Sequence, residues 1–124
     1  MNILIVDDEQ DVQALFELRF RREVRAGEYS LAFCYSGEEA LAYLADHHSE
    51  VVLILSDINM PGMTGFDLLK QIRTQVDMTQ PAVMMITAYN DEQSREQALA
   101  LGAHDYLTKP IDFAALKLKI NRVL

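Results

Sequence analysis

The sequence predicts an α/β protein in which a five-stranded parallel sheet lies between two layers of helices. Strand-like and helix-like segments alternate along the whole of the 124 residues. Three of the strand-like segments, at 2–6, 51–56 and 82–87, are apolar almost throughout. Such runs are typical of strands that are buried on both faces of a sheet. Alternation of this kind favours a three-layer α/β/α sandwich built from five successive strand–helix units.

The first strand, at 2–6, is followed by a predicted helix at 9–25. Apolar residues at helical spacing indicate this helix, and Gly27 marks its end. These apolar residues are Val12, Leu15, Phe16 and Phe20. A second strand is predicted at 29–35, and because its polarity is more mixed we expect it at an edge of the sheet.

Four further helices are predicted from capping side chains, which accept hydrogen bonds from free N–H groups in the first turn of a helix. The caps are a capping box formed by Ser36 and Glu39, the pair Thr64 and Asp67, and single residues at Asn90 and Asp112. The strands between these helices are predicted at 51–56, 82–87 and about 104–107. The helical residues expected to face the sheet are Leu41, Leu44, Leu69, Ile72, Val76, Leu116, Ile120 and Val123.

Composition limits the classes of function. The chain is long enough for one domain with a proper core, and half of its residues are hydrophobic. Its formal charge of −8 disfavours direct binding to nucleic-acid phosphates, which Lys and Arg must neutralise. Cys34 has no partner for an internal disulfide, and no apolar stretch approaches the roughly 20 residues of a membrane span. We therefore expect a cytoplasmic protein without a leader sequence.

Acidic residues follow two of the apolar strands at the point where each strand ends. Asp7 and Asp8 come directly after the first strand, and Asp57 follows the third. Thr87 ends the fourth strand, and Lys109 comes soon after the fifth. Because the carboxyl ends of parallel strands share one edge of a sheet, these side chains should meet at a single crevice. Three close carboxylates repel one another unless a cation joins them, so the pattern predicts a divalent-metal site that accepts a phosphoryl group.

At these positions the sequence resembles the receiver domain of two-component response regulators, and the resemblance covers the whole chain. The matching segments, in the family's order and at strand ends, are residues 3–9, 56–65, 87–89 and 109–110. The resemblance implies a flavodoxin-like sheet in the strand order 2-1-3-4-5. It also implies a single receiver domain over residues 1–124, which stands alone or forms the N-terminal part of a longer protein.

The resemblance assigns a role to each acid. Asp57 is the expected phosphoacceptor, since a carboxylate can attack a phosphoryl group and form an aspartyl-phosphate. Asp8 and Asp57 would bind Mg²⁺ directly, together with the backbone carbonyl of Asn59. Asp7 would act through water. Mg²⁺ prefers one or two carboxylates plus waters and phosphate oxygens, and Mn²⁺ is an expected substitute.

Other residues of the family pattern would hold the phosphoryl group and report its presence. Lys109 is expected to pair with Asp57 before phosphorylation and with a phosphoryl oxygen afterwards. Thr87 would donate its hydroxyl to a second oxygen, beside the backbone N–H of Ala88. Tyr106 resembles the family's switch aromatic and would turn from exposed to buried as Thr87 moves inward. The alternative for Tyr106 is an ordinary packing residue.

Two positions border the expected path of hydrolytic water in this family. They are Asn59 and Tyr89, each two residues after a residue of the phosphoryl site. A bulky Tyr89 would slow loss of the phosphoryl group by shielding it, and comparing the decay rate of a Tyr89→Ala variant with wild type tests this.

The predicted function is a signalling switch rather than an enzyme, since the domain would promote only its own phosphorylation and dephosphorylation. The donor would be a histidine kinase or a histidine phosphotransfer protein. The surface expected to change is formed by the helix after Asn90, the strand at 104–107 and the helix after Asp112. This surface would control an output domain or protein that the sequence does not identify, and it is also the expected face for a homodimer. No direct contact with nucleic acid or a membrane is expected.

Two other functions are less favoured. A Mg²⁺-dependent phosphatase of the haloacid-dehalogenase kind also uses a strand-end aspartate as its nucleophile. It requires a second Asp two residues later as general acid, and this chain has Asn59 there. Its cap would need an insertion, and no loop is long enough. A phosphorylation-independent binding domain would lack some of the acids or the lysine, all of which are present. A separate basic cluster indicates either a solvated helix face, which we favour, or a contact for an acidic partner. It consists of Arg19, Arg21, Arg22 and Arg25.

Overall fold

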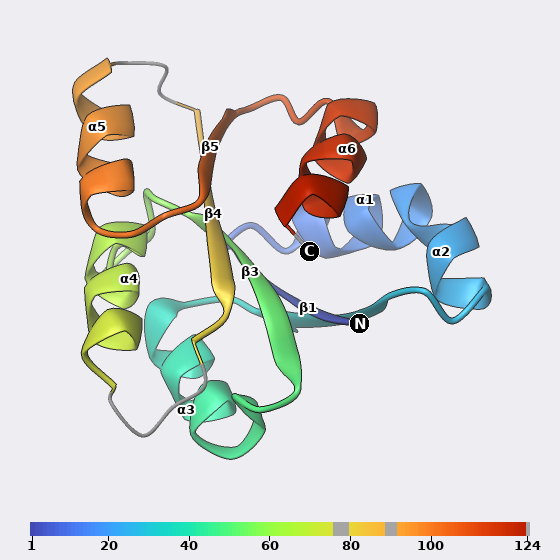
Figure 1. Cartoon of the computed structure of the whole chain (residues 1–124), viewed down its shortest axis with the longest axis horizontal. Helices are drawn as coiled ribbons and strands as arrows, with labels where there is room; N and C mark the ends of the chain where they lie inside the picture. The colour runs from blue at the N-terminus through green and yellow to red at the C-terminus, as the bar shows by residue number, and fades with distance from the viewer. Residues whose placement is uncertain (76–79, 89–91, 124) are drawn as a thin grey trace.

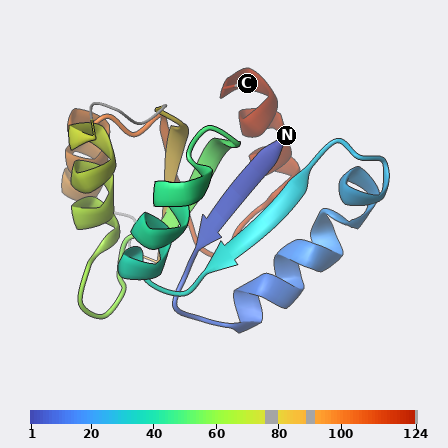
Figure 2. The ribbon, with the colours of Figure 1, turned by 90° about the horizontal axis from the view of Figure 1, so that it is seen from below.

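The computed structural model describes residues 1–75, 80–88 and 92–123 of the chain. Five parallel strands form one sheet in the order β2-β1-β3-β4-β5, which confirms the predicted topology and the edge position of β2. The strands are β1 (Asn2–Val6), β2 (Ser30–Cys34), β3 (Val51–Asp57), β4 (Ala82–Thr87) and β5 (Asp105–Thr108). Helices lie on both sides of this sheet, so the molecule is a three-layer sandwich (Figures 1 and 2).

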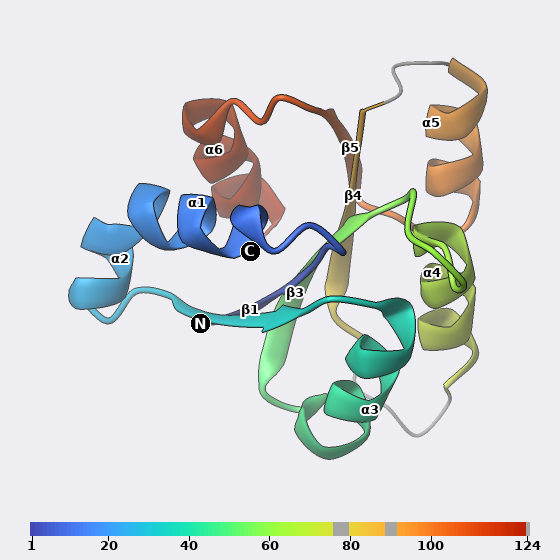
Figure 3. The same cartoon turned by 180° about the vertical axis from the view of Figure 1, so that it is seen from behind.

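Two groups of helices cover the two faces of the sheet (Figure 3). One group is α3 (Gly37–His47), α4 (Gly65–Thr74) and α5 (Glu92–Ala100), and the other is α1 (Asp11–Arg19), α2 (Arg21–Arg25) and α6 (Phe113–Val123). Alternate residues of β1 divide between two cores. Leu4 and Val6 pack on the side of α3, α4 and α5, whereas Ile3 and Ile5 pack with α1 and α6. Burial on both faces explains why the central strands are apolar throughout. None of the helices in these residues has the length and apolar character needed to cross a bilayer.

The prediction of a single helix at 9–25 is wrong, because the structure has two helices there, α1 and α2. The division falls at Phe20, which has φ −103° and ψ 13°. Its ring is fully buried and contacts the rings of Phe16, Tyr29 and Phe113 at centroid distances of 5.8, 5.8 and 6.2 Å. The chain changes direction where this ring enters the core, and helical periodicity alone does not reveal such a bend.

Most of the residues predicted to face the sheet do so. Leu44, Leu69, Ile72, Leu116 and Ile120 are buried, and Val12, Leu41 and Val123 are partly buried against the cores. Leu15, which shares the helical spacing of these residues, is 40% exposed. The buried side of α1 is taken by Phe16, and the residue before it points about 100° away around the helix. Val76 lies outside the described residues.

The predicted helix starts are confirmed where the structure describes them. Thr64 and Asp67 form a complete capping box, with the N–H of each residue donating to the side chain of the other at 3.1 and 3.2 Å. Ser36 accepts a hydrogen bond from the N–H of Glu39 at 3.1 Å. The Glu39 carboxylate accepts from the N–H of Tyr35 rather than closing a box at Ser36. The cap at Asp112 is also present, and Asn90 lies outside the described residues.

Candidate functional site

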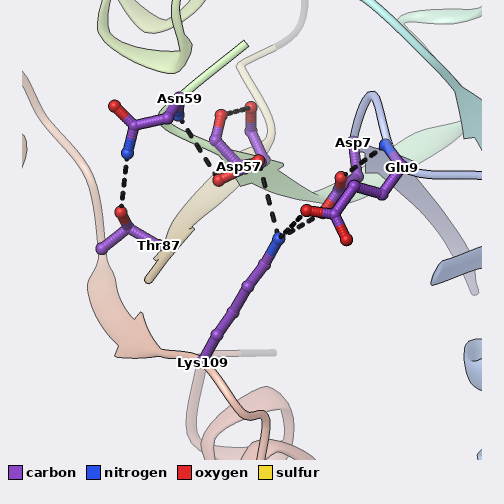
Figure 4. A network of polar contacts seen from close by, with 7 residues as sticks. Asp7, Glu9, Asp57, Asn59, Thr87 and Lys109 are labelled. Atoms are coloured by element: carbon purple, nitrogen blue, oxygen red, sulfur yellow. Dashed lines mark hydrogen bonds and ion pairs between the residues drawn. The ribbon is translucent and has the colours of Figure 1, made fainter. Parts of the chain in front are cut away.

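The carboxyl edge of the sheet gathers the side chains that follow its strands. Asp7 comes directly after β1, Asp57 is the last residue of β3, Thr87 is the last of β4, and Lys109 comes directly after β5. Figure 4 shows these residues converging, with the Lys109 ammonium between Asp7 and Asp57. Four strands that lie side by side therefore supply one polar site.

Three carboxylates form the centre of the site. Asp7, Asp8 and Asp57 each offer an oxygen that lies within 4.8 Å of the other two. Asp7 and Asp57 are buried, whereas Asp8 is exposed. Mg²⁺ takes hard oxygen ligands and keeps several of its waters, and a carboxylate cluster with one member open to solvent meets both requirements. The residues present therefore fit a divalent cation.

Lys109 is the cation that the protein itself supplies to this cluster. Its ammonium is 3.6 Å from the Asp57 carboxylate, which is the predicted pair, but it lies closer to Asp7 at 3.0 Å. Glu9 lies at the outer limit of an ion pair, at 3.9 Å. Burial alone would lower the pKa of Lys109. The hydrogen bond to Asp7 and the charges of Asp57, Asp7 and Glu9 outweigh burial, so the pKa of Lys109 is raised and the ammonium stays charged.

The surroundings of Asp57 make its carboxylate bind a proton more readily than an ordinary aspartate does. Burial, followed by the charge of Asp7, raises the pKa of Asp57 from 3.8 to about 6. The Lys109 charge and the hydrogen bond from the N–H of Asn59 oppose this rise without cancelling it, and Asp8 adds to it. Lys109 and the Asn59 N–H therefore do not fully offset the cost of ionising Asp57, and a further cation at the site would stabilise its carboxylate.

Thr87 is joined to Asn59 by a hydrogen bond that the sequence did not predict. The Asn59 side-chain amide donates to Thr87 Oγ at 3.0 Å, and the Asn59 backbone N–H donates to an Asp57 oxygen at 3.4 Å. Thr87 is buried and Asn59 is exposed, and the Asn59 amide points at the Thr87 hydroxyl (Figure 4). No local spacing rule links these residues, because only the pairing of β3 with β4 brings them together.

The other predicted site residues lie around this centre. Ala88 is exposed and comes directly after Thr87. Tyr106 is half-buried in β5 and packs against the core beneath α3, α4 and α5. Tyr89 lies outside the described residues.

Gly65 lets the first turn of α4 approach the strand that carries Asp57. A Cβ atom at position 65 would lie 2.3 Å from the backbone oxygen of Asp57 and 2.8 Å from the Cα of Ile58. The N–H of Gly65 also donates to the carbonyl of Ile58 at 2.8 Å. The sequence pattern contains this glycine, but its steric role appears only when the strand and the helix are both placed.

A parallel sheet that presents three carboxylates, a hydroxyl and an ammonium at its carboxyl edge defines a receiver domain, the class that the sequence resembles. The sequence profile of the response regulator receiver domain matches residues 3–121, and the chain belongs to this family.

Proteins with similar sequences include several response regulators. The chain is 37% identical over 98% of its length to the regulatory protein AtoC of Escherichia coli (strain K12). It is 34% identical over its full length to the two-component response regulator PhoP of Pseudomonas aeruginosa. It covers 25% of AtoC and 52% of PhoP, so it spans a quarter to about half the length of these relatives.

Solved structures of receiver domains have the same fold. Chemotaxis protein CheY4 of Vibrio cholerae is similar with a TM-score of 0.84 and 28% identity, over 99% of this chain and 98% of that one. A two-component response regulator from Clostridium difficile is similar with a TM-score of 0.86 and 27% identity, over 99% of this chain and 94% of that one.

Proposed function

We propose that the chain is a phosphorylation-activated switch of a two-component system and that Asp57 is its phosphoacceptor. The observation that carries this proposal is the setting of Asp57. Its carboxylate is buried at the end of β3, belongs to a cluster of three acids and lies 3.6 Å from the Lys109 ammonium. Two further acids beside a strand-end carboxylate repel it, and this repulsion is accounted for if the cluster binds a cation and a phosphoryl group.

A divalent cation would be held by Asp8, Asp57 and the backbone carbonyl of Asn59, with Asp7 acting through water. When bound, Mg²⁺ or Mn²⁺ supplies positive charge that offsets the carboxylates and the incoming phosphoryl oxygens. The raised pKa of Asp57, caused first by burial and then by the charge of Asp7, supports this assignment because a bound cation would stabilise the ionised carboxylate.

The proposed reaction is transfer of a phosphoryl group from the phosphohistidine of a histidine kinase or a histidine phosphotransfer protein. An oxygen of Asp57 attacks phosphorus, a P–O bond forms as the P–N bond breaks, and the imidazole leaves with the electron pair. Lys109 then pairs with a phosphoryl oxygen, and the backbone N–H of Ala88 donates to another. Water later hydrolyses the aspartyl-phosphate, so the domain acts on itself rather than on a free substrate.

Thr87 links the phosphoryl group to the surface. Its hydroxyl oxygen accepts a hydrogen bond from the Asn59 amide at 3.0 Å, and its O–H would donate to a phosphoryl oxygen. Inward movement of Thr87 frees space beside β5, into which Tyr106 turns. The surface formed by α5, β5 and α6 then changes shape, and its affinity for a second copy or for an output partner changes with it.

The rest of the proposal concerns the whole protein. Residues 1–124 would act as a single receiver domain in the cytoplasm, and any output would come from another domain or protein. Neither nucleic acid nor a membrane would be bound directly by this domain.

Intact-mass measurement tests the proposal. The wild-type protein is incubated with acetyl phosphate in the presence and absence of Mg²⁺. We expect a gain of one phosphoryl group that requires Mg²⁺ and is absent in Asp57→Asn. Repeated turnover of phosphate esters, without a stable covalent adduct, would instead support the phosphatase alternative and overturn the switch.

A further inference from the structure

A second surface of the molecule has a character opposite to that of the whole chain. It is a groove of about 540 Å³ between α1, α2 and α6, which we call the basic groove. Its lining residues are Leu18, Arg19, Arg21, Arg22, Glu23 and Lys117. Figure 3 places α2 beside the amino end of β1, whereas Asp7 follows the other end of that strand. The groove is therefore remote from the phosphoacceptor.

The basic groove concentrates positive charge on an acidic protein. The chain has 11 Lys and Arg residues against 19 Asp and Glu. Four of the 11, counting Lys117, line this single groove, and Arg25 follows on α2. Clustering of this kind creates a local potential opposite to the net charge of −8.

The one acid that lines the basic groove offsets only one of its four cations. The carboxylate of Glu23 pairs with the Lys117 ammonium at 2.6 Å, and its side chain is only 15% exposed. Arg21, Arg22 and Arg25 are exposed, and none of them forms an ion pair with an acid in the described part of the chain. Their guanidinium groups remain available to pair with carboxylates from outside the molecule.

The basic groove is also partly apolar. Leu18 lines it and is 61% exposed, so an apolar side chain is open to solvent among the charged ones. Aromatic rings inside the protein pack against two of the cations. Arg19 lies 5.8 Å from the centre of the Phe113 ring, and Lys117 lies 5.1 Å from that of Phe20. The basic groove therefore combines one exposed leucine with several cations.

We propose that the basic groove binds a short acidic segment of a partner protein, with carboxylates on the arginines of α2 and an apolar side chain on Leu18. Charge complementarity identifies the occupant. A nucleic acid duplex or an anionic membrane would extend beyond the groove and meet the rest of a surface whose net charge is −8. A short segment can stay within the groove and avoid that repulsion. This contact is distinct from phosphoryl transfer and does not depend on it.

Fluorescence anisotropy with a labelled peptide of Glu and Leu residues tests this proposal on the unphosphorylated full chain. The control peptide carries Gln in place of each Glu. The test variant is Arg21→Glu/Arg22→Glu, and its matched control is Lys70→Glu/Arg95→Glu, which makes the same change in net charge at exposed positions on α4 and α5. Circular dichroism checks that both variants are folded.

We expect the acidic peptide to bind wild type, to bind more weakly as salt is added, and to bind better than the Gln peptide. Exposed ion pairs are individually weak, but two charge reversals should together lower affinity about tenfold or more, and the control pair should change it by less than about twofold. Equal losses in both variants, or no binding to wild type, would overturn the proposal. Tighter binding of duplex DNA or phosphatidylserine vesicles, lost in the same test variant, would also overturn it by naming another occupant.

Discussion

Replacing Asp57 by Asn should stabilise the metal-free protein, although it removes the residue on which phosphorylation depends. Asp57 is only 5% exposed, and burial together with the charge of Asp7 raises its pKa from 3.8 to about 6. A tenfold change in proton affinity is worth about 1.4 kcal/mol, so keeping this carboxylate ionised in the folded protein costs about 3 kcal/mol. Asn has nearly the same shape and no charge, so the variant should recover about 1–3 kcal/mol of this.

The gain from Asp57→Asn should depend on pH in a specific direction. Because the pKa of Asp57 is raised in the folded state, the wild-type protein loses stability as pH rises from 3.8 through about 6, and the loss is complete above that range. The amide does not titrate. The variant's advantage should therefore be full at about pH 8 and should fall below about 1 kcal/mol at about pH 4.

Urea denaturation followed by circular dichroism, with EDTA present, measures this difference at the two pH values. Asp8→Asn is the matched control, because Asp8 belongs to the same cluster but is exposed, and we expect a gain below about 1 kcal/mol for it. Added Mg²⁺ should stabilise wild type more than Asp57→Asn. The reasoning is refuted if Asp57→Asn is no more stable than wild type at the higher pH, or if its advantage is the same at both.

Two changes at the site and one matched pair on α1 and its core test the remaining assignments. Gly65→Ala should lower the free energy of unfolding by about 1–3 kcal/mol in urea denaturation, since its Cβ would lie 2.3 Å from a backbone oxygen, and an unchanged midpoint would contradict the close approach. Lys109→Met should slow the gain of a phosphoryl group from acetyl phosphate by at least about tenfold in timed intact-mass spectra, and a wild-type rate would remove Lys109 from the mechanism. Phe20→Ala should lower the free energy of unfolding by about 3–5 kcal/mol, because the Phe20 ring is fully buried. Leu18→Ala should lower it by under about 0.5 kcal/mol, because Leu18 is 61% exposed. Similar losses in the two variants would contradict the assigned core.

Much of the fold could be predicted because local patterns and the global arrangement agree. Apolar strands alternate with capped helices, and the strand ends carry the polar residues, so the carboxyl edge of a parallel sheet follows from the sequence. The position of β2 at an edge also followed from its mixed polarity. The meeting of Asp7, Asp57 and Lys109 needed only the assumption that adjacent strands are parallel.

The features that could not be predicted depend on contacts between distant segments. The bend at Phe20 exists because its ring contacts Tyr29 and Phe113, and these residues are not neighbours in the sequence. The hydrogen bond from Asn59 to Thr87 likewise depends on the pairing of two strands. A periodic pattern records which face of a helix is apolar, but it does not record what the far end of a side chain will meet.

Mapping the residue that carries the phosphoryl group is the most direct test of the role of Asp57. Wild-type protein is treated with acetyl phosphate and Mg²⁺, reduced with borohydride, digested and sequenced by mass spectrometry, because borohydride converts an aspartyl-phosphate to homoserine. We predict homoserine at position 57 alone, and only when Mg²⁺ was present. Homoserine at Asp7, Asp8 or another acid, or none at all in folded protein supplied with metal and donor, would contradict this assignment.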